Sequence, residues 1–322
     1  RLTVMASDQA AKLDHDTLIS VIVPAYNEES VITEFHRRLI AVAAAQPFSL
    51  EIVYIDDGST DNTLRIIKQL RESDNRITLI DLSRHFGKEI ALTAGLQKAC
   101  GDAVIVIDAD LQDPPALIPE LIQEWQNGYD VVYAQRTHRR GESMVRRTTA
   151  HFFYRIIQRF SRLAIPEDTG DFRILSRRAV NALNSFNEQH RFMKGLFAWI
   201  GYRQKAVRYE RDARQAGSSK WSYWRLWNLA LDGITSFSIA PLKIATYLGL
   251  LTAAGAFAYG IYMVIDTLVH GNPVPGYPSL IVIILMLGGV QLVAIGIIGE
   301  YLGRIFNETK RRPMVFVTLS KA

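Results

Sequence analysis

The chain has 322 residues, 48% of them hydrophobic, which fits one large domain or two smaller ones. Lysine and arginine number 37 against 32 aspartate and glutamate, so the net charge is +5 and favours anionic partners such as nucleic acid, an acidic membrane or phosphorylated substrates. A single cysteine, Cys100, excludes a disulfide within the chain, so we expect a reducing compartment and a buried thiol.

In the first half of the chain, apolar β-prone runs alternate with segments of helical length. Strands are predicted at residues 19–26, 51–57, 76–82, 103–108 and 130–134, and helices at about 29–45, 61–73, 88–100 and 115–127. Continuous apolar strands between helices predict an α/β fold with a mainly parallel, Rossmann-like sheet covered on both faces. Ligands of such sheets bind at the carboxyl ends of the strands.

Polar motifs follow three of these strands, at residues 24–28, 56–61 and 108–113. One acidic strand end is usually a turn or a helix cap, but three at the same edge of a sheet favour a binding site. Oxygen ligands such as those of Asp108, Asp110 and Gln112 suit Mg²⁺ or Mn²⁺, particularly a cation that already carries diphosphate oxygens. No role is assigned to Asp113.

Two further segments have amphipathic helical patterns. Residues 143–163 combine apolar residues at helical spacing with several arginines, which favours a helix on an anionic membrane surface over a basic helix packed on the domain. Residues 220–234 place tryptophans at helical spacing just before a long apolar stretch, which is typical of a helix at the membrane interface.

The composition changes near residue 240. No charged residue occurs from Ile244 to Ile265 or from Ser279 to Gly299, and each stretch can cross a hydrocarbon core of about 30 Å as a helix. We predict two transmembrane helices at about 242–266 and 278–302; a pair of buried helices in a soluble domain is the alternative. Lysine and arginine occur on the outer flanks and not in the connection, so both outer flanks are expected to face the cytoplasm.

The predicted organisation has four parts. They are an N-terminal tail (1–17), a catalytic domain (18–235), a two-helix membrane region (236–306) and a C-terminal tail (307–322). The catalytic domain and both ends of the chain are expected in the cytoplasm. The tail contains a β-prone segment, residues 314–319, which is expected to pair with a neighbouring protomer.

Together the motifs resemble those of the family 2 glycosyltransferases of the GT-A fold, and within them the polyprenyl-phosphate sugar transferases related to dolichol-phosphate mannose synthase. The matching segments are 23–29, 56–61, 86–88, 108–115, 171–173 and 214–220. The two apolar spans and the residues from 301 to 313 look closest to the bacterial bactoprenol glucosyltransferases of the GtrB type.

The resemblance implies roles for particular residues. The nucleoside would be framed by Pro24, Tyr26, Glu28 and Asp57. Asp108, Asp110 and Gln112 would hold Mg²⁺ or Mn²⁺, and Asp108, Asp110 and Asp171 would be the catalytic residues. The donor phosphates would meet Lys88, Arg214 and Lys220, although Lys220 also fits a lysine that snorkels to the membrane interface. The acceptor phosphate would meet Arg136, Arg146 and Arg147, which lipid headgroups would also explain.

The resemblance also implies the reaction. A hexose, expected to be glucose from UDP-glucose, would pass to a polyprenyl phosphate such as undecaprenyl phosphate, with GDP-mannose or another UDP-sugar as alternative donors. A phosphate oxygen is already anionic, so its attack needs little help from a general base, and a single displacement would invert the anomeric carbon. Asp171 would orient the acceptor or the sugar, or residues 171–173 would form a structural turn.

The expected setting is the inner membrane of a bacterium, as a homotetramer. A separate flippase and a downstream glycosyltransferase would handle the product, and nucleic acid is not expected as a partner. A processive polysaccharide synthase would show a Gln-X-X-Arg-Trp motif and more spans. A dinucleotide oxidoreductase would show Gly-X-Gly-X-X-Gly after the first strand, and a membrane scaffold or transporter would not require acidic strand ends.

Overall fold

The computed structural model describes residues 17–137, 169–186, 188–189, 191–209, 240–271 and 276–318. The chain divides into two compact units, one of Arg1–Trp227 with Arg312–Ala322 and one of Asn228–Arg311. The helices expected at 143–163 and 220–234 lie outside the described residues, as do four predicted ligands, Arg146, Arg147, Arg214 and Lys220.

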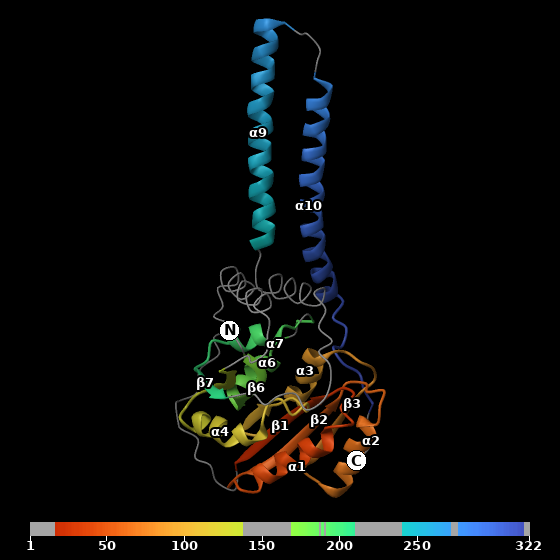
Figure 1. Ribbon diagram of the computed structural model, residues 1–322, viewed down its shortest axis with the longest axis vertical. Helices are drawn as coiled ribbons and strands as arrows, with labels where there is room; N and C mark the ends of the chain where they lie inside the picture. Colours follow the sequence, from red (N-terminus) through yellow and green to blue (C-terminus); the bar gives the residue numbers. More distant parts are fainter. Residues whose placement is uncertain are drawn as a thin grey trace. The chain divides into compact units, whose positions relative to one another are not determined.

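The first unit is built on a sheet of eight described strands in the order β7-β5-β6-β4-β1-β2-β3-β8 (Figure 1). The strands are β1 (Leu18–Ala25), β2 (Ser49–Asp56), β3 (Ile77–Leu82), β4 (Ala103–Val106), β5 (Val131–Arg136), β6 (Thr169–Ser176), β7 (Gln204–Tyr209) and β8 (Val317–Thr318). β6 runs antiparallel to β4 and β5, and β8 runs antiparallel to β3, while the other pairs are parallel. The predicted mainly parallel sheet is confirmed.

The helices of this unit connect the strands. They are α1 (Ile32–Ala43), α2 (Thr63–Ser73), α3 (Lys88–Lys98), the short 3-10 helix η1 (Pro115–Leu117), α4 (Ile118–Gln126), α6 (Arg177–Asn184) and α7 (Met193–Trp199). The predicted elements up to β5 agree with these bounds to within a few residues. The sequence did not predict β6, β7, α6 or α7.

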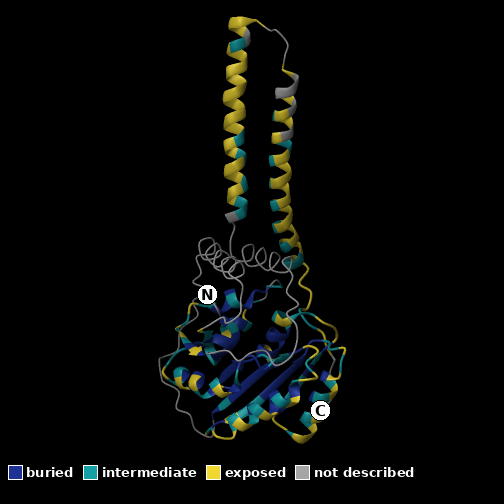
Figure 2. Ribbon diagram, in the orientation of Figure 1, coloured by how far each residue is buried: buried dark blue, intermediate teal, exposed yellow. Residues whose placement is uncertain are grey.

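The sheet has a core on each face, because successive residues of a strand point to opposite sides. Val21 of β1 belongs to a cluster with Phe35 of α1, whereas Ile22 faces α3, where a β-carbon on Gly95 would lie 2.5 Å from its side chain. Figure 2 shows buried strands enclosed by partly exposed helices. Burial on both faces explains why these strands are continuous apolar runs.

Cys100 is exposed, so the expectation of a buried thiol is wrong. The residue follows the end of α3, where the chain becomes extended at Ala99 before the turn into β4. Its backbone N–H donates to Glu51 at 3.0 Å, and its side chain is left at the surface because it lies in this connection rather than in an element that faces the core.

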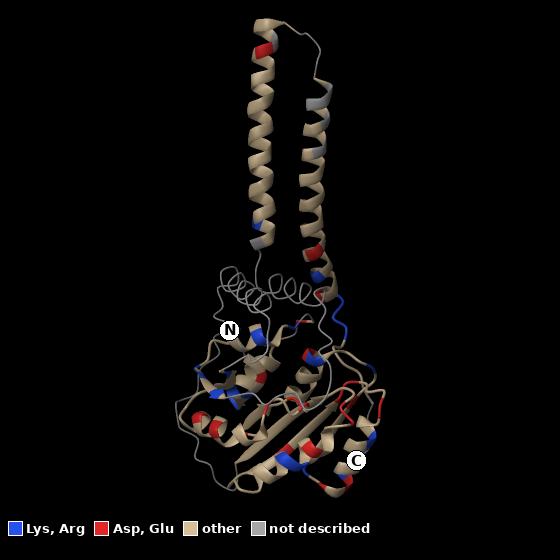
Figure 3. Ribbon diagram, in the orientation of Figure 1, with Lys and Arg blue, Asp and Glu red and all other residues tan. Residues whose placement is uncertain are grey.

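The second unit consists of two long helices, α9 (Ala240–His270) and α10 (Tyr277–Thr309). Both are long and apolar enough to cross a membrane, over Pro241–His270 and Val282–Thr309. Figure 3 shows their few charged residues near the helix ends. The helices predicted at 242–266 and 278–302 are therefore present and extend slightly beyond those limits.

The tail after α10 returns to the first unit. In β8, Val317 pairs with Leu82 and Thr318 with Asp81, and the N–H of Ser83 donates to the carbonyl oxygen of Phe316 at 3.0 Å. The β-prone character of the tail is confirmed, but its partner in the structure is β3 of the same chain, not a neighbouring protomer. β3 would otherwise be an open edge of the sheet, and an open edge can accept any nearby extended segment.

Candidate active site

The register of β4 and β6 brings two distant carboxylates together. Val106, the last residue of β4, pairs with Arg173 of β6 in antiparallel orientation. Continuing that register places Asp108, just beyond β4, beside Asp171, near the start of β6. Residues 171–173 are thus part of a strand and not a turn, and the sheet itself aligns the two carboxylates.

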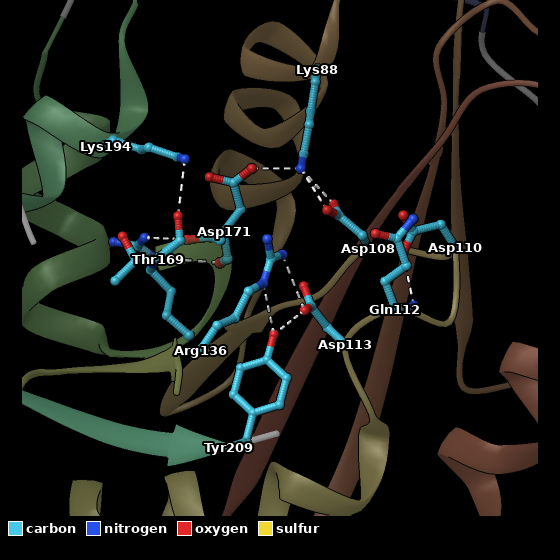
Figure 4. A network of polar contacts seen from close by, with 12 residues as sticks. Lys88, Asp108, Asp110, Gln112, Asp113, Arg136, Thr169, Asp171, Lys194 and Tyr209 are labelled. Carbon is cyan, nitrogen blue, oxygen red and sulfur yellow. Dashed lines mark hydrogen bonds and ion pairs between the residues drawn. The ribbon is translucent and has the colours of Figure 1, made fainter. Parts of the chain in front are cut away.

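Lys88 joins these two carboxylates (Figure 4). It is the first residue of α3, and its ammonium nitrogen lies 2.7 Å from Asp108 and 2.5 Å from Asp171. Burial acts to lower the pKa of Lys88, but the two carboxylates outweigh it and raise that pKa. Burial likewise opposes ionisation of Asp171, yet Lys88 and Lys194 hold its pKa below the usual range. The opposite charges in this site therefore favour the ionised forms of Lys88 and Asp171 despite their burial.

The turn after β4 presents oxygen atoms that suit a hard cation. The carboxylate of Asp110 accepts a hydrogen bond from the backbone N–H of Gln112 at 3.0 Å, and Leu111 between them has φ 58°, a left-handed conformation that is rare for such a residue. Within the described residues, no group of three or more His, Cys, Asp or Glu could hold a metal ion. Two carboxylates and an amide leave positions for phosphate oxygens, as magnesium sites commonly do.

Asp113, which had no assigned role, is buried in a network with Arg136 and Tyr209. The Tyr209 hydroxyl donates to the Asp113 carboxylate, Nη2 of Arg136 lies 3.4 Å from the same oxygen, and Nε of Arg136 donates to the Tyr209 hydroxyl at 3.2 Å. Arg136, predicted to bind the acceptor phosphate, is therefore held on one side by protein groups.

Asp57, predicted to help frame the nucleoside, has several partners within the chain. Its carboxylate is buried and accepts hydrogen bonds from the backbone N–H groups of Phe86 and Gly87 at 2.7 and 3.0 Å, while Nδ1 of His85 lies 2.8 Å away. These contacts fix the loop that leads to Lys88. Tyr26, which is 40% exposed, stacks on the ring of His85 with centroids 4.0 Å apart and offers its other face to a planar ligand.

The other predicted nucleoside residues lie in interlocked loops. Pro24 is near the end of β1, paired with Ile55 of β2, and the N–H of Glu28 donates to the hydroxyl of Thr63 at 2.8 Å. Asn27, with φ 55°, accepts from the N–H of Thr60 at 2.8 Å. The motifs after β1 and β2 therefore position each other, which explains much of their polar character.

Two charged residues of the site were not found from sequence. Glu89 accepts from the N–H of Met193 at 3.1 Å, and burial, with a contribution from Asp171, raises the pKa of this carboxyl to about 7. Lys194 donates to the carbonyl oxygen of Thr169 at 3.0 Å. Lys194 lies in α7, and Glu89 lies in the predicted helix α3 but has its partner Met193 at the start of α7. Because the sequence did not predict α7, the only signal for either residue was the position of Glu89 next to Lys88.

Comparison with known proteins defines the class. The glycosyl transferase family 2 profile matches residues 20–183, and the GtrB C-terminal hairpin profile matches residues 240–305. The chain belongs to glycosyl transferase family 2 and is a glycosyltransferase with the GT-A fold.

Relatives match nearly the whole chain. A bactoprenol glucosyl transferase of Shigella phage SfV is 49% identical over 303 residues, covering 94% of this chain and 99% of that protein. An uncharacterized glycosyltransferase of Synechocystis sp. is 50% identical and covers 93% of this chain and 94% of that protein. Glucosyl-3-phosphoglycerate synthase from Mycobacterium tuberculosis, solved with Mn²⁺ and UDP-glucose, is 20% identical with a TM-score of 0.46 and covers 68% of this chain and 78% of its own; this likeness is too distant to bear on substrate or metal.

Proposed function

We propose that the protein transfers glucose from UDP-glucose to a polyprenyl phosphate, with undecaprenyl phosphate as the acceptor. The observation that carries the proposal is the 49% identity to a bactoprenol glucosyl transferase over 94% of this chain and 99% of that protein. Because the similarity includes both the domain with the candidate site and the two apolar helices, it supports the same pairing of a sugar donor with a lipid acceptor.

The donor side of the site is formed by the loops after β1, β2 and β4. Tyr26 provides an exposed aromatic face for the base, with Pro24 and Glu28 shaping the loop around it. Asp57 acts through the loop that it holds, and Lys88 at the start of α3 supplies positive charge for the donor phosphates. Arg214 and Lys220 would add charge from the part of the chain that is not described.

The residues of the turn after β4 fit Mg²⁺ or Mn²⁺. Asp108 and Asp110 offer carboxylates and Gln112 an amide oxygen, so all three donors are hard. When bound, the cation would neutralise charge on the departing nucleoside diphosphate. Lys88 already pairs with Asp108 at 2.7 Å, so its charge and that of the cation would act on the same carboxylate.

The acceptor brings its own nucleophile. An oxygen of the lipid phosphate is anionic at neutral pH and attacks the anomeric carbon as the bond to the diphosphate breaks, so inversion follows from a single displacement. Asp171 is suited to orient a hydroxyl of the sugar, because its Oδ1 is buried without a hydrogen-bond partner among the described residues. Arg136, with Arg146 and Arg147, would bind the lipid phosphate.

A lipid acceptor fits a protein held in the membrane. The helices α9 and α10 are proposed to cross the inner membrane of a bacterium, with the catalytic domain and both chain ends in the cytoplasm. The proposed assembly is a homotetramer. A separate flippase and a downstream glycosyltransferase would carry the sugar-lipid across the membrane and consume it.

A donor screen tests this proposal. Full-length protein in nanodiscs with undecaprenyl phosphate and Mg²⁺ or Mn²⁺ is expected to transfer glucose from UDP-glucose faster than any sugar from GDP-mannose or other UDP-sugars. Transfer only from GDP-mannose would replace the donor assignment, and no transfer from any donor would reject the function.

One pair of variants separates catalysis from folding. Asp110→Asn keeps an oxygen that can accept from the Gln112 N–H but removes the charge, so transfer is expected to fall by at least about a hundredfold. Asp102→Asn is the matched control, because Asp102 accepts from the N–H of Leu18 at the opposite end of β4. Unchanged transfer in Asp110→Asn would reject the metal assignment.

A further inference from the structure

Protein groups contact one edge of the guanidinium group of Arg136. Nε donates to the hydroxyl of Tyr209 at 3.2 Å, and Nη2 lies 3.4 Å from Asp113, which also accepts from that hydroxyl. Figure 4 shows the hydroxyl of Tyr209 between the two charged groups and the guanidinium of Arg136 between Asp113 and Asp171. The three residues come from the end of β5, the end of β7 and the turn after β4.

Two contacts on one edge fix the orientation of a planar guanidinium. The third nitrogen, Nη1, has no hydrogen bond within the described part of the chain, and the Arg136 side chain is 24% exposed. Gly170 lies close to the same edge, because a β-carbon there would be 3.2 Å from Nη2 of Arg136 and 3.4 Å from Asp113. The arginine therefore has little freedom and one donor nitrogen left for an anion.

We propose that Asp113 and Tyr209 are positioning residues of the acceptor site, which hold Arg136 so that Nη1 meets the phosphate of the lipid acceptor. Because Asp113 directly follows Gln112, the same network ties the acceptor arginine to the turn with the cation ligands. This proposal rests on the proposed transfer to a lipid phosphate. It assigns a function to a buried tyrosine that no motif of the family match contains, since that match ends at residue 183.

The alternative is that the network only stabilises the conformation of the turn after β4 and has no role in binding the acceptor. In that case, loss of the Tyr209 hydroxyl would disturb Asp110 and Gln112, and binding of the cation would weaken. The acceptor role predicts the opposite pattern, in which the phosphate of the acceptor is bound less well and the cation is bound as before. Kinetics with both substrates and a cation titration therefore separate the two roles.

The test is Tyr209→Phe in the full-length protein. The acceptor KM is expected to rise about tenfold, as for the loss of one hydrogen bond to a charged group, while the KM for UDP-glucose and the affinity for Mn²⁺, titrated by electron paramagnetic resonance without turnover, stay within about twofold. Tyr129→Phe is the matched control. Tyr129 lies beside β5 at the end away from the site, where its ring packs against Arg203, and its substitution is expected to change none of these values.

A double-mutant cycle shows whether Tyr209 acts through Arg136. In an Arg136→Ala background, Tyr209→Phe is expected to raise the acceptor KM no further, because its target is gone. If the Tyr209→Phe variant is too unstable to assay, Asp113→Asn replaces it. The asparagine oxygen can still accept a hydrogen bond from Tyr209, so a smaller rise in the acceptor KM is expected.

Two results would overturn the positioning role. One is an unchanged acceptor KM in Tyr209→Phe, whether or not the binding of Mn²⁺ weakens, and the other is that the effects of Tyr209→Phe and Arg136→Ala on the acceptor KM multiply independently. Absence of transfer by the wild-type protein to any polyprenyl phosphate would reject the proposed function itself, and the positioning role with it.

Discussion

The ammonium group of Lys88 forms an ion pair with the carboxylate of Asp108 at 2.7 Å. Lys88 begins α3 and Asp108 follows β4, so the pair connects a helix start to a strand end. Through its second contact, with Asp171 at 2.5 Å, the same lysine reaches β6. One positive charge thus balances two carboxylates that would otherwise repel each other.

The first prediction concerns Lys88→Met. Transfer is expected to fall by at least about a hundredfold, because the charge proposed to stabilise the leaving diphosphate is lost. Affinity for Mn²⁺ without nucleotide is expected to rise, because Asp108 is no longer paired with a lysine. Lys98→Met, in the last turn of the same helix, is the control and should change neither value. Weaker binding of Mn²⁺ in Lys88→Met would contradict this interpretation.

The second prediction concerns Asp57→Asn. The asparagine can accept from only one of the two N–H groups, of Phe86 and Gly87, that Asp57 now accepts from, so one buried contact is lost. The free energy of unfolding should fall by about 1–3 kcal/mol, and the KM should rise by the same factor for UDP- and GDP-sugars. A change in the preference between uridine and guanosine nucleotides, without loss of stability, would show instead that Asp57 contacts the base.

The position of Asp108, Asp110 and Gln112 at the edge of the sheet could be predicted from sequence, because these residues come soon after an apolar strand. Asp108 comes just after the continuous apolar run of β4, and Lys88 begins α3; the ends of parallel strands meet at one edge of a sheet. The network of Asp113, Arg136 and Tyr209 could not be predicted in this way. Arg136 and Tyr209 are partners at the ends of the paired strands β5 and β7, and β6 lies between β5 and β4, the strand that Asp113 follows. The sequence predicted neither β6 nor β7, so the order of strands that brings the three residues together could not be derived from it.

The third prediction concerns the pH dependence of stability through Glu89. Burial raises the pKa of its carboxyl to about 7 in the folded protein, above the value of an unfolded chain. The contribution of the neutral Glu89 carboxyl to the free energy of unfolding is therefore complete below the pKa of the unfolded chain and is lost as the pH rises towards 7. Glutamine is neutral at every pH. The free energy of unfolding of Glu89→Gln should therefore equal that of the wild-type protein at pH 5 and exceed it at pH 8 by about 1–3 kcal/mol.

Thermal melts of both proteins at pH 5 and pH 8 measure this difference. Glu120→Gln on α4, whose side chain is exposed, serves as the control and is expected to melt like the wild-type protein at both values. A Glu89→Gln variant that is less stable at pH 8 than the wild-type protein would show that Glu89 is needed as a carboxylate, for example to balance Lys88 and Lys194.

The last prediction concerns deletion of residues 314–322. The tail supplies the antiparallel partner of Leu82 and accepts from the N–H of Ser83 at 3.0 Å, directly before the loop that Asp57 holds. Hydrogen exchange of the Ser83 amide is expected to accelerate, and the KM for UDP-glucose to rise as the loop loosens. If the strand pairs within its own chain, the oligomeric mass in detergent stays the same, whereas a fall in mass on deletion would show that the tail joins protomers. Val317→Pro, which keeps the tail but disrupts its pairing with Leu82, should reproduce the faster exchange at Ser83.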